Sequence, residues 1–456
     1  MLKRKDINMT EGPLLKNIIL YTLPIIFTGV LQLLFNAADL VVVGRFGGSV
    51  CVAAVGSTGA LINLIINMFI GLSVGAGVTV ARAKGAGNDA EVHKAVHTAV
   101  LTSLVSGALL IGIGVASAGT LLKMMKTPGD ILPLATKYMR IYFVGMLSSM
   151  VYNFGAAILR ALGDTRGPLI YLTAAGVVNI LLNLLFVTAF GMDVDGVAWA
   201  TVISQTLAAA LVLLALARRD DSARLIFKKL RVYSDSLRQI MRIGLPAGLQ
   251  SVMFNISNVI IQSSVNSFGL VAVNSGNSAA GNIEGFVYVS MNAFHQTALN
   301  FAGQNVGAGK TRRVNQILAC CLVCVTVAGA ALGVLGYVFG RQLLSIYIVD
   351  SPEAIEFGLV RLSLICLPYF LCGQMDVTTG ALRGMGSSFL PMVITVVGVC
   401  VLRVVWIYTV FAMPQYHTLD MLYLSYVISW IVSFLAQLAA FRAVYNNRLR
   451  KEVASV

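Results

Sequence analysis

The segment NIILYTLPIIFTGVLQLLFNAADLVVV, residues 17–43, carries a single charged side chain, Asp39. A helix needs about 20 predominantly apolar residues to cross about 30 Å of hydrocarbon. The segment is longer than the apolar core of a signal peptide, and no small-residue cleavage site follows it. The sequence therefore predicts a first transmembrane helix that is retained in the mature protein.

The rest of the chain repeats this apolar pattern. Only 11% of its residues are charged and 57% are hydrophobic, whereas soluble domains carry about 25% charged residues. The strands of a membrane barrel would be about ten residues long with strict alternation, which these runs lack. The predicted fold class is an all-α polytopic membrane protein with twelve transmembrane helices, at residues 17–43, 50–81, 95–125, 138–162, 167–190, 196–217, 240–268, 271–303, 314–340, 359–385, 388–412 and 421–443.

The basic residues gather on one side of these spans. Of the 33 Lys and Arg residues, 25 lie in the two terminal segments, which include Lys3, Arg4 and Lys5, or in the even-numbered connections. Because Lys and Arg collect in cytoplasmic loops, we expect both termini in the cytoplasm and the chain in the plasma (inner) membrane. The net charge of +14 is then a topology signal and a contact with anionic membrane lipid, not a nucleic-acid site.

The two halves of the chain repeat each other. Leu23-Pro24 matches Leu245-Pro246, and Gly85-Ala86-Gly87 matches Gly307-Ala308-Gly309, both at the same offset. We therefore expect two pseudo-symmetric six-helix lobes, residues 1–217 and 239–456, related by an axis along the membrane normal with a cavity between them. The basic linker 218–238 interleaves cationic and apolar residues, which predicts a helix lying on the cytoplasmic membrane face.

Acidic residues inside the predicted spans are the first functional candidates. Only Asp39, Glu284 and Asp376 of the 19 acidic residues lie well inside a span. An acidic side chain at the centre of a membrane helix costs about 2.5–3.5 kcal/mol on insertion scales. A neutral residue would pack there at a lower cost, so a functional reason for these acids is favoured.

Asp39 shares one helix face with Gln32 and Asn36, and a later span offers Asn179 and Asn183 at the i, i+4 spacing. A carboxylate surrounded by amide oxygens can hold a hard monovalent cation such as Na⁺. It can also bind a proton, because burial disfavours the charged form. The alternative interpretation of the Asn residues is hydrogen bonding between helices.

The second half offers a different lining. One helix face combines an acid, two aromatic rings and a thioether, which suits a cationic, aromatic ligand through charge, cation–π contacts and an adaptable Met side chain. The alternative is ordinary packing. Arg403 lies alone within a span, where it would pair with an acid of the second half or extend to the interface. The candidate substrate or coupling residues are Glu284, Asp376, Asn258, Tyr288, Met291 and His295.

Catalytic and nucleotide-binding motifs are missing from the sequence. It contains no phosphate-binding P-loop, no His-Glu-x-x-His and no Cys/His zinc array. The seven cysteines lie mostly in apolar segments, which indicates packing thiols and no disulfide framework. Active transport by this chain would therefore draw on an ion gradient, since one charge crossing 100 mV is worth about 2.3 kcal/mol.

The sequence resembles the multidrug and toxic compound extrusion (MATE) transporters along nearly its whole length. The resemblance is carried by Leu23-Pro24, by Asp39-Leu-Val-Val-Val-Gly44, by Ala53-Ala54-Val55-Gly56, and by the segments at residues 303–309 and 380–386. It implies two six-helix lobes and export of bulky organic cations in exchange for Na⁺ or H⁺, by a membrane protein that needs no cofactor. A monomer is expected.

The resemblance also implies site residues. One branch of the family holds its ion in the N-terminal lobe, and Asp39, Asn179 and Thr201 fill three of its four positions. Asn183 stands where that branch has an acid, which lowers the charge of the site and leaves the ion open. Another branch uses carboxylates on helices 7 and 10; helix 7 here has none, Asp376 matches only approximately, and Glu284 would be the substitute.

Two other functions fit parts of the pattern. A lipid-linked oligosaccharide flippase of the same superfamily would want a basic central cavity, which three mid-span acids against Arg403 disfavour. An intramembrane lipid-modifying enzyme would use Glu284 and Asp376 as an acid/base pair, yet no nucleophile or metal array accompanies them. An ion-coupled exporter is therefore the leading prediction, and its substrate, ion and stoichiometry stay open.

Overall fold

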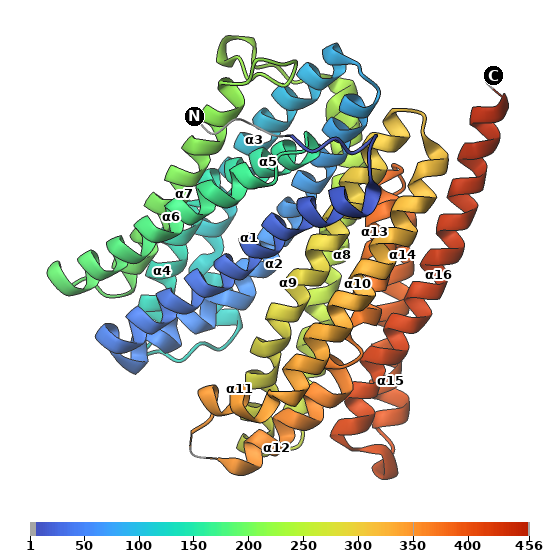
Figure 1. The fold of residues 1–456 in the computed structure, drawn as a ribbon. Coiled ribbons are helices and arrows are strands. Elements are labelled where there is room, and N and C mark those ends of the chain that lie inside the picture. The colour runs from blue at the N-terminus through green and yellow to red at the C-terminus, as the bar shows by residue number, and fades with distance from the viewer. Residues whose placement is uncertain (1–5, 350, 455–456) are drawn as a thin grey trace. The chain divides into compact units, whose positions relative to one another are not determined.

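The computed structural model describes residues 6–349 and 351–454, so the basic residues Lys3, Arg4 and Lys5 lie outside the described part. All elements in those two ranges are helical (Figure 1). In chain order they are α1 (Leu14–Val42), η1 (Val43–Gly47), α2 (Gly48–Gly85), α3 (Asp89–Met124), α4 (Leu132–Val144), α5 (Met146–Ala161), α6 (Arg166–Leu184), η2 (Leu185–Ala189), α7 (Val194–Ala217), η3 (Phe227–Lys229), α8 (Ser234–Asn266), α9 (Val271–Gly307), α10 (Thr311–Val338), α11 (Gly340–Tyr347), α12 (Pro352–Arg361), η4 (Leu362–Cys366), α13 (Tyr369–Gly384), α14 (Phe389–Thr395), η5 (Val396–Val401), α15 (Leu402–Trp406), η6 (Ile407–Phe411), η7 (Pro414–Tyr416) and α16 (Leu419–Ala454).

These helices confirm the predicted fold class. Within the described residues, eight continuous helices are long and apolar enough to cross a membrane. In two further cases, a pair of helices joined at a bend meets the same criteria when it is taken as one span. The remaining two predicted spans correspond to α8 and α9, which are 33 and 37 residues long but more polar. The chain is thus a multi-pass α-helical membrane protein, and each of the twelve predicted spans falls on one helix or one broken helix.

The fourth span of each half is broken, which the sequence analysis did not predict. α4 and α5 meet at a bend of 46° around Gly145, and the segment that starts with α12 meets α13 at 41°. In the second case Pro368 lies at the break. Proline has no N–H to donate and its ring clashes with the preceding turn, so a helix bends or ends there.

The chain forms two compact units. Unit 1 comprises Met1–Asn8 and Leu23–Gly248, and unit 2 comprises Met9–Thr22 and Leu249–Val456. The division therefore runs through α1 and α8, close to Pro24 and Pro246, and assigns the linker to unit 1. The predicted lobes 1–217 and 239–456 describe the sequence repeat and remain a proposal about domain organisation.

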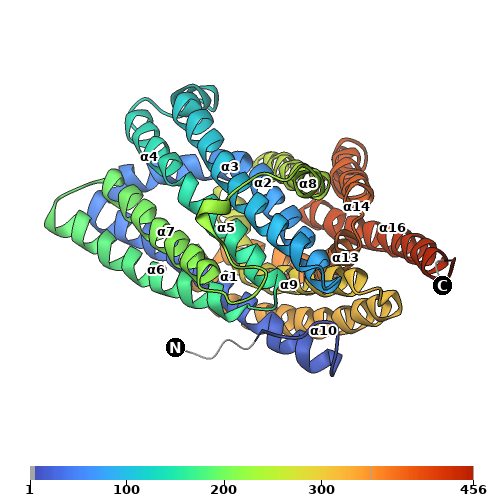
Figure 2. The ribbon, with the colours of Figure 1, turned by 90° about the horizontal axis from the view of Figure 1, so that it is seen from above.

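Unit 1 is built around α5, which packs against α2, α3 and α7. α6 and α7 run side by side in both views (Figure 1 and Figure 2). The start of α8 lies against α2, and a Cβ added to Gly71 would lie 2.2 Å from the backbone N of Gly248. Helices that approach this closely need small residues at the contact.

Unit 2 is built around α9, which packs against α10, α12 and α13. A Cβ added to Gly380 would lie 2.4 Å from the carbonyl oxygen of His295, so glycine is needed where α13 crosses α9. The start of α1 completes this unit, because the hydroxyls of Thr22 and Thr297 share a hydrogen bond of 2.8 Å. Tyr21 packs edge-on against Phe301 in the same contact.

The prediction of a surface helix over 218–238 is wrong for most of that segment. Residues 218–233 contain only the single turn η3, and α8 begins at Ser234. The backbone N–H groups of Ile226 and Tyr233 instead donate to His97 Nε2 and Thr98 Oγ1 of α3, both at 3.1 Å. A helix would have used those donors internally.

An ion cluster ties the linker to the N-terminal segment. Arg219 is buried, and its Nη2 donates to Asp6 at 2.6 Å and to Asp221 at 2.7 Å. Burial acts to raise the pKa of Asp221, but the hydrogen bond and charge of the Arg219 guanidinium outweigh it and hold that pKa below its usual value. The carboxylates of Asp6 and Asp221 therefore balance the buried positive charge of Arg219 near the end of α7.

Candidate functional site

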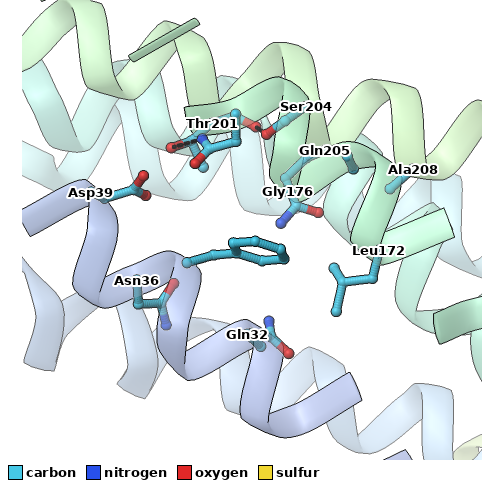
Figure 3. Close-up of a pocket in the computed structure, with 12 residues that line it drawn as sticks. Gln32, Asn36, Asp39, Leu172, Gly176, Thr201, Ser204, Gln205 and Ala208 are labelled. Atoms are coloured by element: carbon cyan, nitrogen blue, oxygen red, sulfur yellow. Dashed lines mark hydrogen bonds between the residues drawn. The ribbon is translucent and has the colours of Figure 1, made fainter. Parts of the chain in front are cut away.

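A small, partly open cleft lies within unit 1, between α1, α6 and α7. Polar side chains of α1 face polar side chains of α7 across it (Figure 3). The lining residues are Gln32, Phe35, Asn36 and Asp39 from α1, Leu172, Ala175, Gly176 and Asn179 from α6, and Thr201, Ser204, Gln205 and Ala208 from α7.

Four of the predicted cation-binding residues are linked by hydrogen bonds. Asn183 Nδ2 donates to Asp39 Oδ1 at 2.5 Å and to Asn179 Oδ1 at 3.3 Å. Asn179 Nδ2 in turn donates to Thr201 Oγ1 at 3.5 Å. The fifth residue, Asn36, lines the cleft with an exposed side chain. The structure therefore brings together three helices at the carboxylate of Asp39.

One acceptor in this group has no partner. Asn179 is 5% exposed and Asn183 is fully buried. Among the described residues, Asn183 Oδ1 has no hydrogen-bond donor. A buried, unpaired amide oxygen costs about 1–3 kcal/mol, and a cation beside Asp39 would satisfy it. Carboxylate, amide and hydroxyl oxygens are the donor set that hard cations prefer.

A glycine positions α1 against α6 in this cleft. A Cβ added to Gly176 would lie 2.0 Å from two ring atoms of Phe35, one turn before Asp39. Only glycine lets the Phe35 ring pass over α6, and this approach brings Asp39 within reach of Asn183. The sequence analysis did not identify Gly176, because nothing in its spacing reports which helix lies opposite.

We expect Gly176→Ala to displace α1 from α6. Overpacking of this kind costs about 1–3 kcal/mol and would lower the unfolding temperature in detergent as well as the rate of any transport that depends on Asp39. The double variant Gly176→Ala/Phe35→Leu should recover both, since the smaller side chain removes the clash. Equal losses in the single and double variants would contradict this role for Gly176.

Two polar lining residues of α7 were missed by the sequence analysis. Ser204 and Gln205 belong to the same face of α7 as Thr201 and line the cleft. Gln205 follows Thr201 at the i, i+4 spacing, which could have identified it. Its Oε1 is buried without a hydrogen-bond donor among the described residues.

The acid predicted in α9 has a permanent partner. Arg361 of α12 donates from Nε to Glu284 Oε1 and from Nη2 to Glu284 Oε2, both at 2.8 Å. Arg361 Nη1 also donates to Asn277, whose Oδ1 accepts from Tyr423 at 2.9 Å. The sequence analysis did not pair Glu284 with Arg361, and the role of Glu284 in substrate binding or coupling stays a prediction.

The other residues predicted on the Glu284 face are dispersed. Tyr288 is 42% exposed, whereas Met291 is fully buried. A Cβ added to Gly373 would lie 2.6 Å from Met291 Sδ, so Met291 fills space between α9 and α13. His295 Nδ1 contacts the carbonyl oxygen of Asp376 at 2.7 Å. Asn258 is exposed on α8. Packing accounts for Met291, and the backbone contact accounts for His295.

Asp376 and Arg403 differ in their surroundings. Asp376 is partly buried on α13, and no ion pair joins it to another described residue. Arg403 is 1% exposed, stacks 3.9 Å from the Tyr426 ring centroid and donates from Nε to Ser429 Oγ at 2.9 Å. Within the described residues Arg403 neither pairs with an acid nor extends to the surface. Its guanidinium instead packs against aromatic rings of α16.

Comparisons with known proteins match both halves of the chain. A family model described as MatE matches residues 24–185 and 246–409. The chain is 29% identical to the probable multidrug resistance protein YpnP of Bacillus subtilis, covering 88% of this chain and 89% of that protein. It is 24% identical to the FAD transporter of Shewanella oneidensis, with 82% of each covered.

Solved structures share the fold. A multidrug resistance MATE family transporter of the MOP superfamily, in an outward-facing conformation, superposes with a TM-score of 0.90 at 21% identity. The alignment covers 98% of this chain and 99% of that structure.

Proposed function

This chain belongs to the MatE family, and on that basis we propose that it is an antiporter, coupled to Na⁺ or H⁺, that exports amphipathic organic cations by alternating access. Family members are multidrug efflux transporters of small organic compounds, and nothing in the fold or the comparisons indicates an enzyme. The lipid-linked oligosaccharide flippase considered from sequence gains no support from these relatives.

The observation that carries the proposal is the cluster at Asp39. A lone carboxylate sits in the cleft of unit 1 beside a fully buried Asn183, whose amide already donates to it. A Na⁺ ion would take oxygen ligands from Asp39, Asn179, Asn183 and Thr201. A proton would convert Asp39 from acceptor to donor, and the Asn183 amide can turn its unpaired oxygen to meet it. Either ion neutralises the single negative charge.

Ion binding would drive transport through α1. This helix carries Asp39 on one side of Pro24, and the residues before Leu23 belong to unit 2. A change at Asp39 therefore acts on a helix shared by both units. A ligand shifts a conformational equilibrium only by its differential affinity for the two states, so the proposal requires the cation to bind one arrangement of α1 and α6 more tightly than the other.

The orientation and partners follow from charge. We propose both termini in the cytoplasm and a location in the plasma membrane, because the positive loops lie on the side of the termini. The proposed partners are small organic cations and membrane lipid, for a monomer without a cofactor. Of the two acids predicted inside spans of the second half, Glu284 is paired with Arg361, whereas no ion pair joins Asp376 to another described residue, so we propose Asp376 as the substrate-facing charge of unit 2.

A second substrate class has a specific observation in its favour. Arg361 neutralises Glu284, so unit 2 has fewer unpaired acids inside its spans than the sequence analysis predicted. Arg403 adds a buried positive charge that has no acid partner among the described residues. One similar protein is named as an FAD transporter, which indicates that this fold can carry an anion. The transport experiment must therefore include one cationic and one anionic substrate.

The test is transport by the purified protein in proteoliposomes. Efflux of ethidium and of FAD would be followed under an imposed Na⁺ gradient and, separately, an imposed H⁺ gradient. We expect one gradient to drive ethidium movement and FAD to remain unmoved. Movement of FAD alone would replace the proposed substrate class, and movement of ethidium without dependence on either gradient would contradict coupling.

A further inference from the structure

The linker exposes a short basic segment with an aromatic side chain at its centre. Its sequence is RLIFKKLR, residues 224–231. Phe227 is 56% exposed, and the side chains of Arg224, Lys228, Lys229 and Arg231 are exposed around it. Leu225 alone is fully packed, at 2% exposure. We call residues 224–231 the basic loop.

The basic loop is held by backbone bonds on both sides. Leu225 N donates to Leu216 O at 3.1 Å, and Ile226 N donates to His97 Nε2 at 3.1 Å. After the loop, Tyr233 N donates to Thr98 Oγ1 at 3.1 Å. Both acceptors are buried in α3. The exposed Phe227 therefore belongs to an ordered surface anchored to unit 1.

His97 can accept the hydrogen bond from the Ile226 N–H only as one tautomer of its ring. Its Nδ1 contacts the carbonyl oxygen of His93 at 2.8 Å, so Nδ1 carries the proton and Nε2 offers its lone pair to Ile226. Two consecutive helical side chains thus fix two points of the linker. That arrangement fixes the direction in which the charges between them project.

The positive charges of the basic loop are not compensated by the protein. No ion pair joins its four cationic side chains to another residue within 6–349 and 351–454. Of the nearby acids, Asp6 and Asp221 are bound to Arg219, and Asp220 and Asp235 flank the loop in sequence without a described ion pair to it. No acid occurs within the loop itself. The surface therefore combines four cations that lack an ion pair, of which Arg231 lies 6.0 Å from the Tyr233 ring centroid, with the exposed ring of Phe227. This chemistry fits an anionic, partly apolar partner.

We propose that the basic loop binds the headgroups of anionic phospholipids, with Phe227 entering the membrane interface. The loop begins seven residues after the last residue of α7 and bonds to His97 near the start of α3, and both helices are long and apolar enough to cross a membrane. Anionic headgroups are therefore within reach at all times. A Lys or Arg near such a surface is worth about 1 kcal/mol, and aromatic rings favour the interface. This binding is independent of the proposed transport activity.

The test uses the full chain with Phe227→Trp in vesicles of phosphatidylcholine. Brominated phosphatidylglycerol, or brominated phosphatidylcholine at the same mole fraction, serves as the fluorescence quencher. With several cations contributing about 1 kcal/mol each, we expect at least about twofold stronger quenching by the anionic lipid. The signal of protein without Phe227→Trp is subtracted, because Trp199, Trp406 and Trp430 also emit.

A matched control separates local from general charge. Lys228→Gln/Lys229→Gln/Arg231→Gln should abolish the preference for the anionic lipid. Lys123→Gln/Lys126→Gln/Arg140→Gln removes as many exposed charges from the other end of the helices and should leave it unchanged. In the parent Phe227→Trp protein, added salt should reduce the preference, which tests the proposal without charge variants.

Three results would overturn the proposal: equal quenching by the two lipids, no quenching by either, or the same loss in both triple variants. Absence of quenching would mean that Phe227 faces water and serves a soluble partner. Because the readout is fluorescence, failure here leaves the transport proposal intact, and failure of transport leaves lipid binding intact.

Discussion

Replacing Asp39 by Asn is expected to abolish ion-driven efflux while preserving the fold of unit 1. Asn keeps the shape of the side chain and can still accept from Asn183, so the contact between α1 and α6 survives. It cannot be neutralised by a cation or exchange a proton. A net driving force of about 2.3 kcal/mol per exchange cycle, the energy of one charge crossing 100 mV, sustains about a 50-fold accumulation ratio. That ratio should collapse to unity in proteoliposomes.

Two other acids serve as controls for Asp39. Asp195 lies at the start of α7 in a half-exposed pair with Lys137 at 2.8 Å. Surface pairs contribute about 0–1 kcal/mol, so Asp195→Asn should leave both unfolding and coupling near the parent values. Asp376→Asn should weaken substrate binding and leave gradient dependence in place. If Asp376→Asn uncouples transport and Asp39→Asn does not, the coupling site lies in unit 2.

The parts of the site within one helix were predictable from sequence. The spacing of Gln32, Asn36 and Asp39 places them on one face, and burial cost marks Asp39 as unusual; all three line the cleft. The resemblance to MATE transporters supplied Thr201. Asn179 and Asn183 were found by the same i, i+4 rule, and their contact with α1 follows once Gly176 admits Phe35.

The parts that depend on contacts between distant helices were not predictable. Glu284 and Arg361 are 77 residues apart, and the sequence does not report that α9 packs against α12. The linker has the composition of a surface helix, but acceptors 129 and 135 residues away, on His97 and Thr98, capture its backbone donors. In both cases a tertiary partner outweighs the local pattern.

Arg361→Met is expected to destabilise unit 2 strongly. The side-chain exposure of this pair is 13% for Arg361 and 7% for Glu284. Removing the guanidinium leaves a buried carboxylate without its counter-charge, which costs about 3–5 kcal/mol. Asn277 would also lose one of its donors, although Tyr423 still bonds to it. The expected result is a lower unfolding temperature in detergent and a larger aggregated fraction in size-exclusion chromatography.

The double variant Arg361→Met/Glu284→Met distinguishes a structural pair from a coupling acid. Replacing both members of a buried ion pair by apolar side chains of similar volume is often neutral or stabilising by about 1–4 kcal/mol, so stability should return. If the pair only joins α9 to α12, gradient-driven efflux should return with it. Recovered stability with lost gradient dependence would instead make Glu284 a coupling group. A single variant as stable as the parent would show that the pair does not form. Because the free energy of the pair and the coupling of transport are read separately, the cycle shows whether Glu284 is the gradient-harvesting carboxylate.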